Sequence, residues 1–214
     1  MRAATVLNVD EGLATALARL EAILGRLGAA IVPLLHPGIG EREVLAALQG
    51  IGLTPSAEVV TWFRWHNGAG ERGMPTSHIQ LVPAGEFYDL RYLCGKYHEA
   101  RSASEYVAST TAELPSKTGF RATADDMWRV SWFPLLSLLR KGSIAVDLGA
   151  DETTSPVHIV WADSDLELRS RPVWPTIRAF VETVIARFED GTYWVNDEGI
   201  VDGQAMDHWS EQRD

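Results

Sequence analysis

Two pairs of residues have the types that nucleophilic catalysis uses. His66 and Asn67 end the aromatic stretch "TWFRWHN", and Cys94 and His98 are four residues apart, so on a helix their side chains would meet. A hydrolase using Cys94 or His66 is therefore one hypothesis. Against it, neighbours such as His66 and Asn67 point about 100° apart on a helix, and no nucleophile is tied to them by spacing. A lone helical cysteine is usually an inert part of a core.

Three acidic residues alternate along a short stretch, as the oxygen ligands of calcium do in some loops. These are Asp163, Asp165 and Glu167, but the stretch lacks the glycine and the bidentate glutamate of an EF-hand loop. Cys94 is the sole cysteine, so neither an intrachain disulfide nor a cysteine-rich zinc site can form. No glycine-rich phosphate motif with lysine is present. The sequence predicts no metal and no cofactor.

The charge balance limits the classes of partner. The net charge is −10 and the pI is near 5.0, so nucleic acid and anionic membranes would be repelled, while a basic protein would be attracted. The first residues contain acidic side chains and lack the apolar run of a secretory signal, and no stretch approaches the ~20 apolar residues of a membrane span. We therefore expect a cytoplasmic protein.

The acidity is concentrated in two windows. Residues 147–167 carry six acidic and no basic residues, and residues 189–214 carry eight acidic residues and one arginine. Trp161, Trp194 and Trp209 lie in these windows. Exposed aromatic residues rimmed by carboxylates are typical anchors of protein interfaces, although core packing is the simpler interpretation of any tryptophan.

The elements that would position these residues begin with helices. Leucines spaced by three and four predict an amphipathic helix over residues 12–27, with Asp10 as its cap and Gly28 as its end. A second short helix is expected within "EREVLAALQGIG". A third is expected to start at Thr54-Pro55 and to stop at Asn67-Gly68, so the aromatic stretch is interpreted as a core-packing helix.

The rest of the chain changes from helix to strand. A short strand at residues 79–82 and a helix to about residue 106 precede the polar residues 107–127, which we expect to be a mobile insertion. Four strand-like segments follow, "WRVSWFPLL", "SIAVDL", "PVHIVWAD" and "LELRSR", with turn-like connections that predict an antiparallel meander. A helix with apolar residues from 177 to 188 and a hairpin around "NDEG" close the chain.

This order of helices, meander and helix indicates an α+β fold. The stretch "HPGIGEREVLAALQGIGLTPSAEVVTWFRWHNGAG" resembles the N-terminal signature of the SUKH superfamily, with its Pro-Gly turn, Leu-x-Pro helix start and Asn-Gly ending. The segments "WFPLLSLLRKGSIAVDLGADETTSPVHIVWAD" and "FVETVIARFEDGTYWV" are similar to its later strands and closing helix. The likeness runs in order over residues 35–200, whereas the insertion at 107–127 is longer than the usual pattern.

The resemblance implies a single SUKH-like domain over residues 1–214, with a central, mostly antiparallel sheet flanked by helices and a helical extension over about residues 1–34. It implies no catalysis. SUKH members include bacterial immunity proteins that neutralise a cognate toxin, often a nuclease, and fungal regulators of cell-wall assembly. We expect a non-enzymatic immunity protein that binds a basic toxin domain, the alternatives being a regulatory or scaffold protein and the hydrolase. The residues expected to bind the partner are Asp147, Asp151, Trp161, Asp163, Asp165, Trp194, Asp197 and Glu198.

Overall fold

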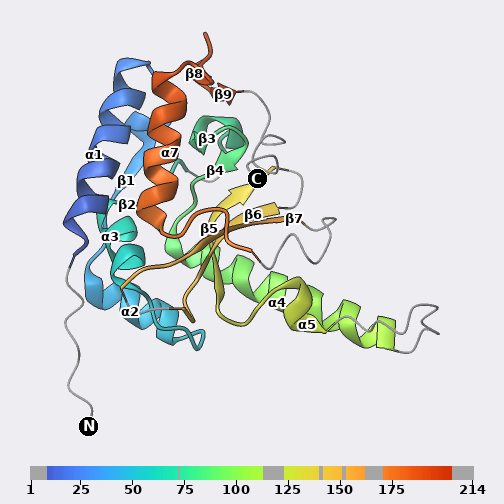
Figure 1. Cartoon of the computed structure of the whole chain (residues 1–214). Helices are drawn as coiled ribbons and strands as arrows, with labels where there is room; N and C mark the ends of the chain where they lie inside the picture. Colours follow the sequence, from blue (N-terminus) through green and yellow to red (C-terminus); the bar gives the residue numbers. More distant parts are fainter. Residues whose placement is uncertain are drawn as a thin grey trace.

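The computed structural model describes residues 9–71, 73–112, 123–139, 142–150, 153–161 and 171–203. They form a mixed α+β fold with three antiparallel sheets (Figure 1). The α+β class expected from the order of elements is confirmed. None of the described helices is long and apolar enough to cross a membrane.

The central sheet has five strands in the order β3-β4-β5-β6-β7. All neighbours are antiparallel, so the expected meander is confirmed for β5, β6 and β7. The strands are β3 (Gln80–Val82), β4 (Gly85–Glu86), β5 (Trp132–Leu138), β6 (Gly142–Asp147) and β7 (Val157–Trp161). The fourth strand-like segment, "LELRSR", lies almost wholly outside the described residues.

Helices α1 (Glu11–Arg26), α3 (Ala57–Trp65) and α7 (Ile177–Glu189) pack with one face of this sheet in the main core (Figure 1). The six apolar residues of α7 are all buried, as their spacing predicts, and contribute on the order of 10 kcal/mol before entropy is counted. The leucine stripe of α1 lies in the same core and packs along α7. Because α1 is part of the main core, the expected N-terminal extension is an integral layer of the fold.

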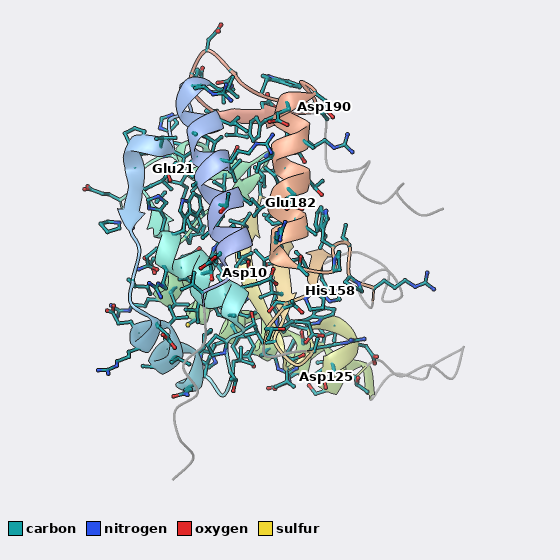
Figure 2. The ribbon with its side chains drawn as sticks, turned by 60° about the vertical axis from the view of Figure 1, so that its left-hand side comes forward. Asp10, Glu21, Asp125, His158, Glu182 and Asp190 are labelled. Carbon is teal, nitrogen blue, oxygen red and sulfur yellow. The ribbon has the colours of Figure 1, made fainter. Side chains whose placement is uncertain are left out.

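The ends of α1 match the expectation, whereas those of α3 do not. The Asp10 carboxylate accepts from Leu13 N, and its own N–H donates to Thr61 on α3, which brings the start of α1 beside α3 (Figure 2). Gly28 follows α1 with a φ of 74°. The prediction that α3 starts at Thr54-Pro55 is wrong, because Ser56 is the cap and its hydroxyl accepts from the N–H of Val59.

The aromatic stretch also ends differently from the prediction. Helix α3 stops at Trp65, and His66 is already extended. Residues His66–Ala69 form β2, which pairs with β1 (Leu35–Pro37), while α2 (Glu41–Gln49) lies between β1 and α3 in the chain. Gly68 has a φ of 80°, and a Cβ there would lie 2.3 Å from Asp89 N. Asn67 and Gly68 therefore belong to strand β2, and Gly68 packs closely against Asp89. They do not cap the helix.

Helix α4 (Leu90–Ala112) covers the other face of the sheet (Figure 1). The prediction of a mobile insertion over residues 107–127 is wrong for its two ends, because residues 107–112 continue α4 and Ala124–Met127 form α5. Residues 113–122 lie outside the described residues. The polar composition of residues 107–112 therefore did not exclude a helix.

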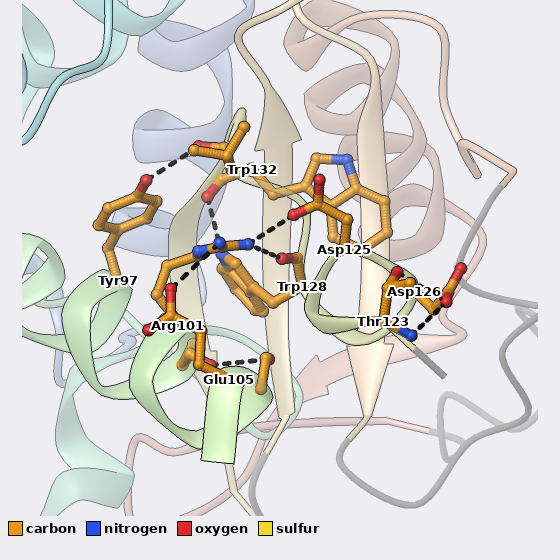
Figure 3. Close-up of polar contacts among 11 residues, drawn as sticks. Tyr97, Arg101, Glu105, Thr123, Asp125, Asp126, Trp128 and Trp132 are labelled. Carbon is orange, nitrogen blue, oxygen red and sulfur yellow. Dashed lines mark hydrogen bonds and ion pairs between the residues drawn. The ribbon is translucent and has the colours of Figure 1, made fainter. Parts of the chain in front are cut away.

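A small second core joins α4, α5 and this face of the sheet. It contains Trp128, Trp132, Ala145 and Val160. Arg101 on α4 holds α5 in place, donating to the Asp125 carboxylate at 2.7 Å and to the Trp128 carbonyl at 2.6 Å (Figure 3). Because the guanidinium binds two groups of the α5 segment at once, this helix of four residues has a fixed position.

Candidate functional site

The last described segment of the chain is a hairpin that presents a tryptophan among acidic residues. It consists of β8 (Tyr193–Val195) and β9 (Val201–Gly203), confirming the expected hairpin. Trp194 and Asp202 are directly opposite each other and both are exposed, with 42% of Trp194 accessible. Tyr193 and Val201 point the other way and are buried. Strand alternation thus divides the hairpin into an anchoring face and an exposed face.

The turn of this hairpin fixes two further carboxylates on the surface. The side-chain oxygen of Asn196 accepts from the N–H groups of Glu198 and Ile200, both at 3.0 Å. Gly199 adopts a φ of 78°, which favours glycine, and its carbonyl accepts from Ala30 N at 2.8 Å. Asp197 and Glu198 are exposed in the turn. The turn is therefore held both internally and against the residues that follow α1.

We name Trp194, Asp197, Glu198 and Asp202 the hairpin patch. Three of these residues are among those expected to bind a partner, and the structure places them on one hairpin. Asp202 was not singled out from the sequence, although its position opposite Trp194 follows once the hairpin is predicted. The patch combines three carboxylates with one half-exposed aromatic ring, which is the composition of an interface anchor.

Asp147 lies away from the hairpin patch. It ends β6 and pairs with Trp132 at the start of β5, whereas the hairpin adjoins the opposite end of the sheet, where Gly203 approaches Pro83. The six residues of β6 separate the two ends by about 17 Å at ~3.4 Å per residue. The Asp147 carboxylate accepts a hydrogen bond from Gly149 N at 2.9 Å. Asp147 is therefore not joined to Trp194 in one compact patch.

The remaining expected partner-binding residues fall beyond the description. Asp151, Asp163 and Asp165 lie outside the described residues, and so does the side chain of Trp161, which ends β7. Glu167 and Trp209 also lie outside them. Across the parts of the chain that are described, no group of three or more His, Cys, Asp or Glu side chains could hold a metal ion.

His66 is held by oxygen atoms on both sides of its ring. Nδ1 lies 2.7 Å from the carbonyl oxygen of His36, and Nε2 lies 3.2 Å from the carboxylate of Glu21, which also accepts from the Trp65 indole. Because both ring nitrogens face acceptors, neither is placed to activate a nucleophile. The side chain instead ties the end of α3 to α1 and β1.

Cys94 and His98 both lie on α4, as expected, but their environments do not favour nucleophilic catalysis. Cys94 is half-buried and His98 is exposed. No hydrogen bond joins them in the described part of the chain. Burial raises the pKa of the Cys94 thiol, and the Asp89 carboxylate raises it further, so the reactive thiolate is disfavoured. The hydrolase hypothesis therefore gains no support from either candidate residue.

A buried carboxylate that sequence reasoning missed ties three elements together. Glu58 on α3 is fully buried, and its two oxygens accept from the backbone N–H groups of Ser155, Ile177 and Arg178 at 2.8, 3.2 and 3.0 Å. Ile177 and Arg178 open α7, so Glu58 caps a helix distant in sequence. Burial raises the pKa of Glu58, and the three N–H bonds partly offset this effect. All of its contacts belong to the fold.

The chain was compared with models of known protein families and with curated proteins, and neither comparison found a match.

Proposed function

We propose that this chain is a binding protein of the SUKH type, which neutralises a basic toxin domain by covering its active surface. The proposal rests on the sequence resemblance and on one structural observation, an exposed tryptophan on an anchored hairpin that also carries three exposed carboxylates. This role requires no catalytic residues. Such a protein would act where its toxin acts, which we propose is the cytoplasm.

The physical chemistry of the hairpin patch fits this role. Trp194 supplies apolar area at the centre of a contact, where aromatic residues provide most of the binding energy. Asp197, Glu198 and Asp202 supply negative charge, which speeds the encounter with a basic surface and rejects acidic ones. Because the turn is fixed by Asn196 and Gly199, little conformational entropy is lost when the patch binds.

The test is protection of cells that produce a basic toxin domain encoded beside this gene. Wild-type protein should restore growth and bind the purified toxin. Replacing Trp194 by Ala together with Asp197→Lys and Glu198→Lys should weaken binding by at least about tenfold and abolish protection. Asp147→Lys is the matched control, because it reverses a charge at the other end of the sheet and should leave both readouts near wild type.

Two results would overturn this assignment. Unchanged affinity of the hairpin variant at low salt would remove the patch from the interface. If Asp147→Lys lost protection to the same extent as the hairpin variant, the net charge of the protein would account for binding and the hairpin patch would not. Binding of a cellular partner through the same patch, with no toxin involved, would favour the regulatory or scaffold role instead.

A further inference from the structure

A groove of about 650 Å³ lies between α4 and the sheet face formed by β4 to β7, beside the second core. This size is typical of a ligand-binding pocket. It exists because short side chains meet there. Ala100 and Ala103 on α4 face a part of the sheet that carries Ser137 and Ser143. Helix and sheet therefore enclose space that larger residues, such as Trp128 and Trp132, fill in the neighbouring core.

The floor of the groove is a polar row across adjacent strands. Glu86 on β4 is in register with Ser137 on β5, and Ser137 with Ser143 on β6. Residues in register share one face of a sheet, and all three line the groove. The row offers a carboxylate and two hydroxyl groups within one concave surface. Three acceptors match the three N–H donors of an ammonium group.

Within the described ranges, no cation pairs with the Glu86 carboxylate. Only 6% of Glu86 is exposed, and the nearby hydroxyl of Tyr88 is a neutral group. Among the described residues no ion pair involves Glu86. A buried carboxylate without a cation is costly, so a cationic group entering the groove would be bound favourably.

Lys96 lines the groove, but its ammonium group is paired with another carboxylate. Its Nζ donates to the Glu99 carboxylate at 2.7 Å and lies 5.5 Å from the centre of the Tyr92 ring. These contacts hold the ammonium group at the rim, where 35% of the Lys96 side chain is exposed. The rim pair is neutral as a whole, and the negative charge of the floor remains.

The turn between β3 and β4 contacts both the rim of the groove and strand β9 of the last hairpin. Leu139, an exposed apolar residue at the rim, donates its N–H to the carbonyl of Ala84 at 3.0 Å. The neighbouring Pro83 lies against Gly203 of β9, where an added Cβ would be 2.9 Å from the proline ring. The groove and the hairpin that carries the patch therefore contact one and the same turn.

We propose that the groove receives a lysine side chain of the protein partner. The aliphatic stem would pack against the apolar walls formed by Tyr92, Val107 and Leu139, and the ammonium group would meet Glu86 and the two serines. A lysine fits better than an apolar residue because its ammonium group brings both donors and positive charge to the buried carboxylate, whereas an apolar side chain brings neither. The identity of the occupant as a partner segment rests on the proposed function, whereas the preference for lysine rests on the groove itself.

The test uses two short peptides and needs no partner. Acetyl-Leu-Lys-Leu-amide is compared with the same peptide carrying norleucine, which keeps the stem but lacks the ammonium group. Both are titrated into the ¹⁵N-labelled full chain and followed by amide shifts. The lysine peptide should shift Ala100, Leu139 and Ser143 and bind at least about fivefold more tightly than the norleucine peptide. Glu86→Gln should abolish this preference, while Asp147→Asn, which removes one carboxylate at the other end of the sheet, should keep it.

Equal binding of the two peptides, shifts outside the groove, no binding of either peptide, or a preference that survives Glu86→Gln would overturn the proposal. Ser143→Trp, which fills the groove without touching Glu86, should block the lysine peptide and supplies a second variant if Glu86→Gln does not fold. The result is independent of the toxin assay. Loss of the hairpin-patch interface with an intact lysine preference would refute the proposed function alone, and the reverse outcome would refute the groove alone.

Discussion

Glu58 and Glu86 are both buried glutamates, but the regions around them are built differently. Glu58 lies where α3, the start of α7 and the short segment before β7 meet, and three backbone N–H groups donate to its carboxylate. Glu86 lies on the face covered by α4, at the floor of a groove, with the hydroxyl of Tyr88 nearby. The Glu58 carboxylate is bound by backbone N–H groups, whereas the Glu86 carboxylate lines a groove.

The difference separates a structural charge from one available for binding. A carboxylate that accepts several fixed N–H bonds compensates its burial within the fold, and removing it leaves those donors unsatisfied. A carboxylate that faces a groove has acceptor capacity left for a molecule from outside. Burial alone does not distinguish the two cases, since both residues are at least nine-tenths buried. The two cases differ in the hydrogen-bond partners of the carboxylate oxygens.

The largest effect is expected for Glu58→Ala. Three buried N–H groups would lose their acceptor, and each buried unsatisfied donor costs about 1–3 kcal/mol, so we expect a loss of roughly 3–5 kcal/mol in the free energy of unfolding. Urea denaturation measures it. Glu58→Gln, which keeps one acceptor oxygen, should fall between Ala and wild type. A loss below about 1 kcal/mol for Ala would contradict the capping role.

A smaller loss is expected when α5 is released from α4. Arg101→Met removes the donors to Asp125 and the Trp128 carbonyl and should cost about 2 kcal/mol, because bonds to charged groups are worth ~1.5–3 kcal/mol each before compensation. Hydrogen exchange at Trp128, whose N–H donates to Ala124, should accelerate. Lys96→Met is the control, since this exposed pair contributes about 0.5 kcal/mol. Equal losses in both variants would show that Arg101 does not fix α5.

The pH dependence of stability tests the same contrast through Glu58. Burial raises the pKa of Glu58 above 4.5, so the folded state holds the proton more tightly than the unfolded state. The stability of the wild type relative to Glu58→Gln should be highest below pH 4.5 and should fall as pH rises through the raised pKa. Urea titrations of both proteins from pH 4 to 8 measure it. A difference that grows with pH would mean that the N–H bonds outweigh burial.

Periodic signals in the sequence predicted the elements well. The leucines of α1, the six-residue stripe of α7 and the turn residues of the last hairpin depend on local spacing, which a sequence displays directly. The expected start of α3 is two residues early, because Ser56 suits a cap as well as Thr54 does and the surrounding fold decides between them. The length of α4 was underestimated because its last turns are polar.

The functional surfaces were harder to anticipate. The hairpin patch follows from local signals, and three of its four residues were expected. The role of Glu58 joins residues about 120 positions apart, and no local pattern indicates such a contact. The groove depends on which serines come into register and on alanines facing them across a gap. The small residues Ala100 and Ala103 on α4 are the sequence feature that indicates the groove.

Glu86→Gln should have the smallest effect on stability and therefore sharpens the contrast most. The substitution keeps the size of the side chain and removes a charge that no fixed backbone N–H among the described residues binds, so the free energy of unfolding should change by less than about 1 kcal/mol in either direction. Urea denaturation beside Glu58→Gln, an identical substitution, gives the comparison. A loss as large as that of Glu58→Gln would mean that Glu86 is also bound within the fold. A near-neutral result, with the lysine preference gone, would separate the two carboxylates by what their oxygens bind and not by how deeply they lie.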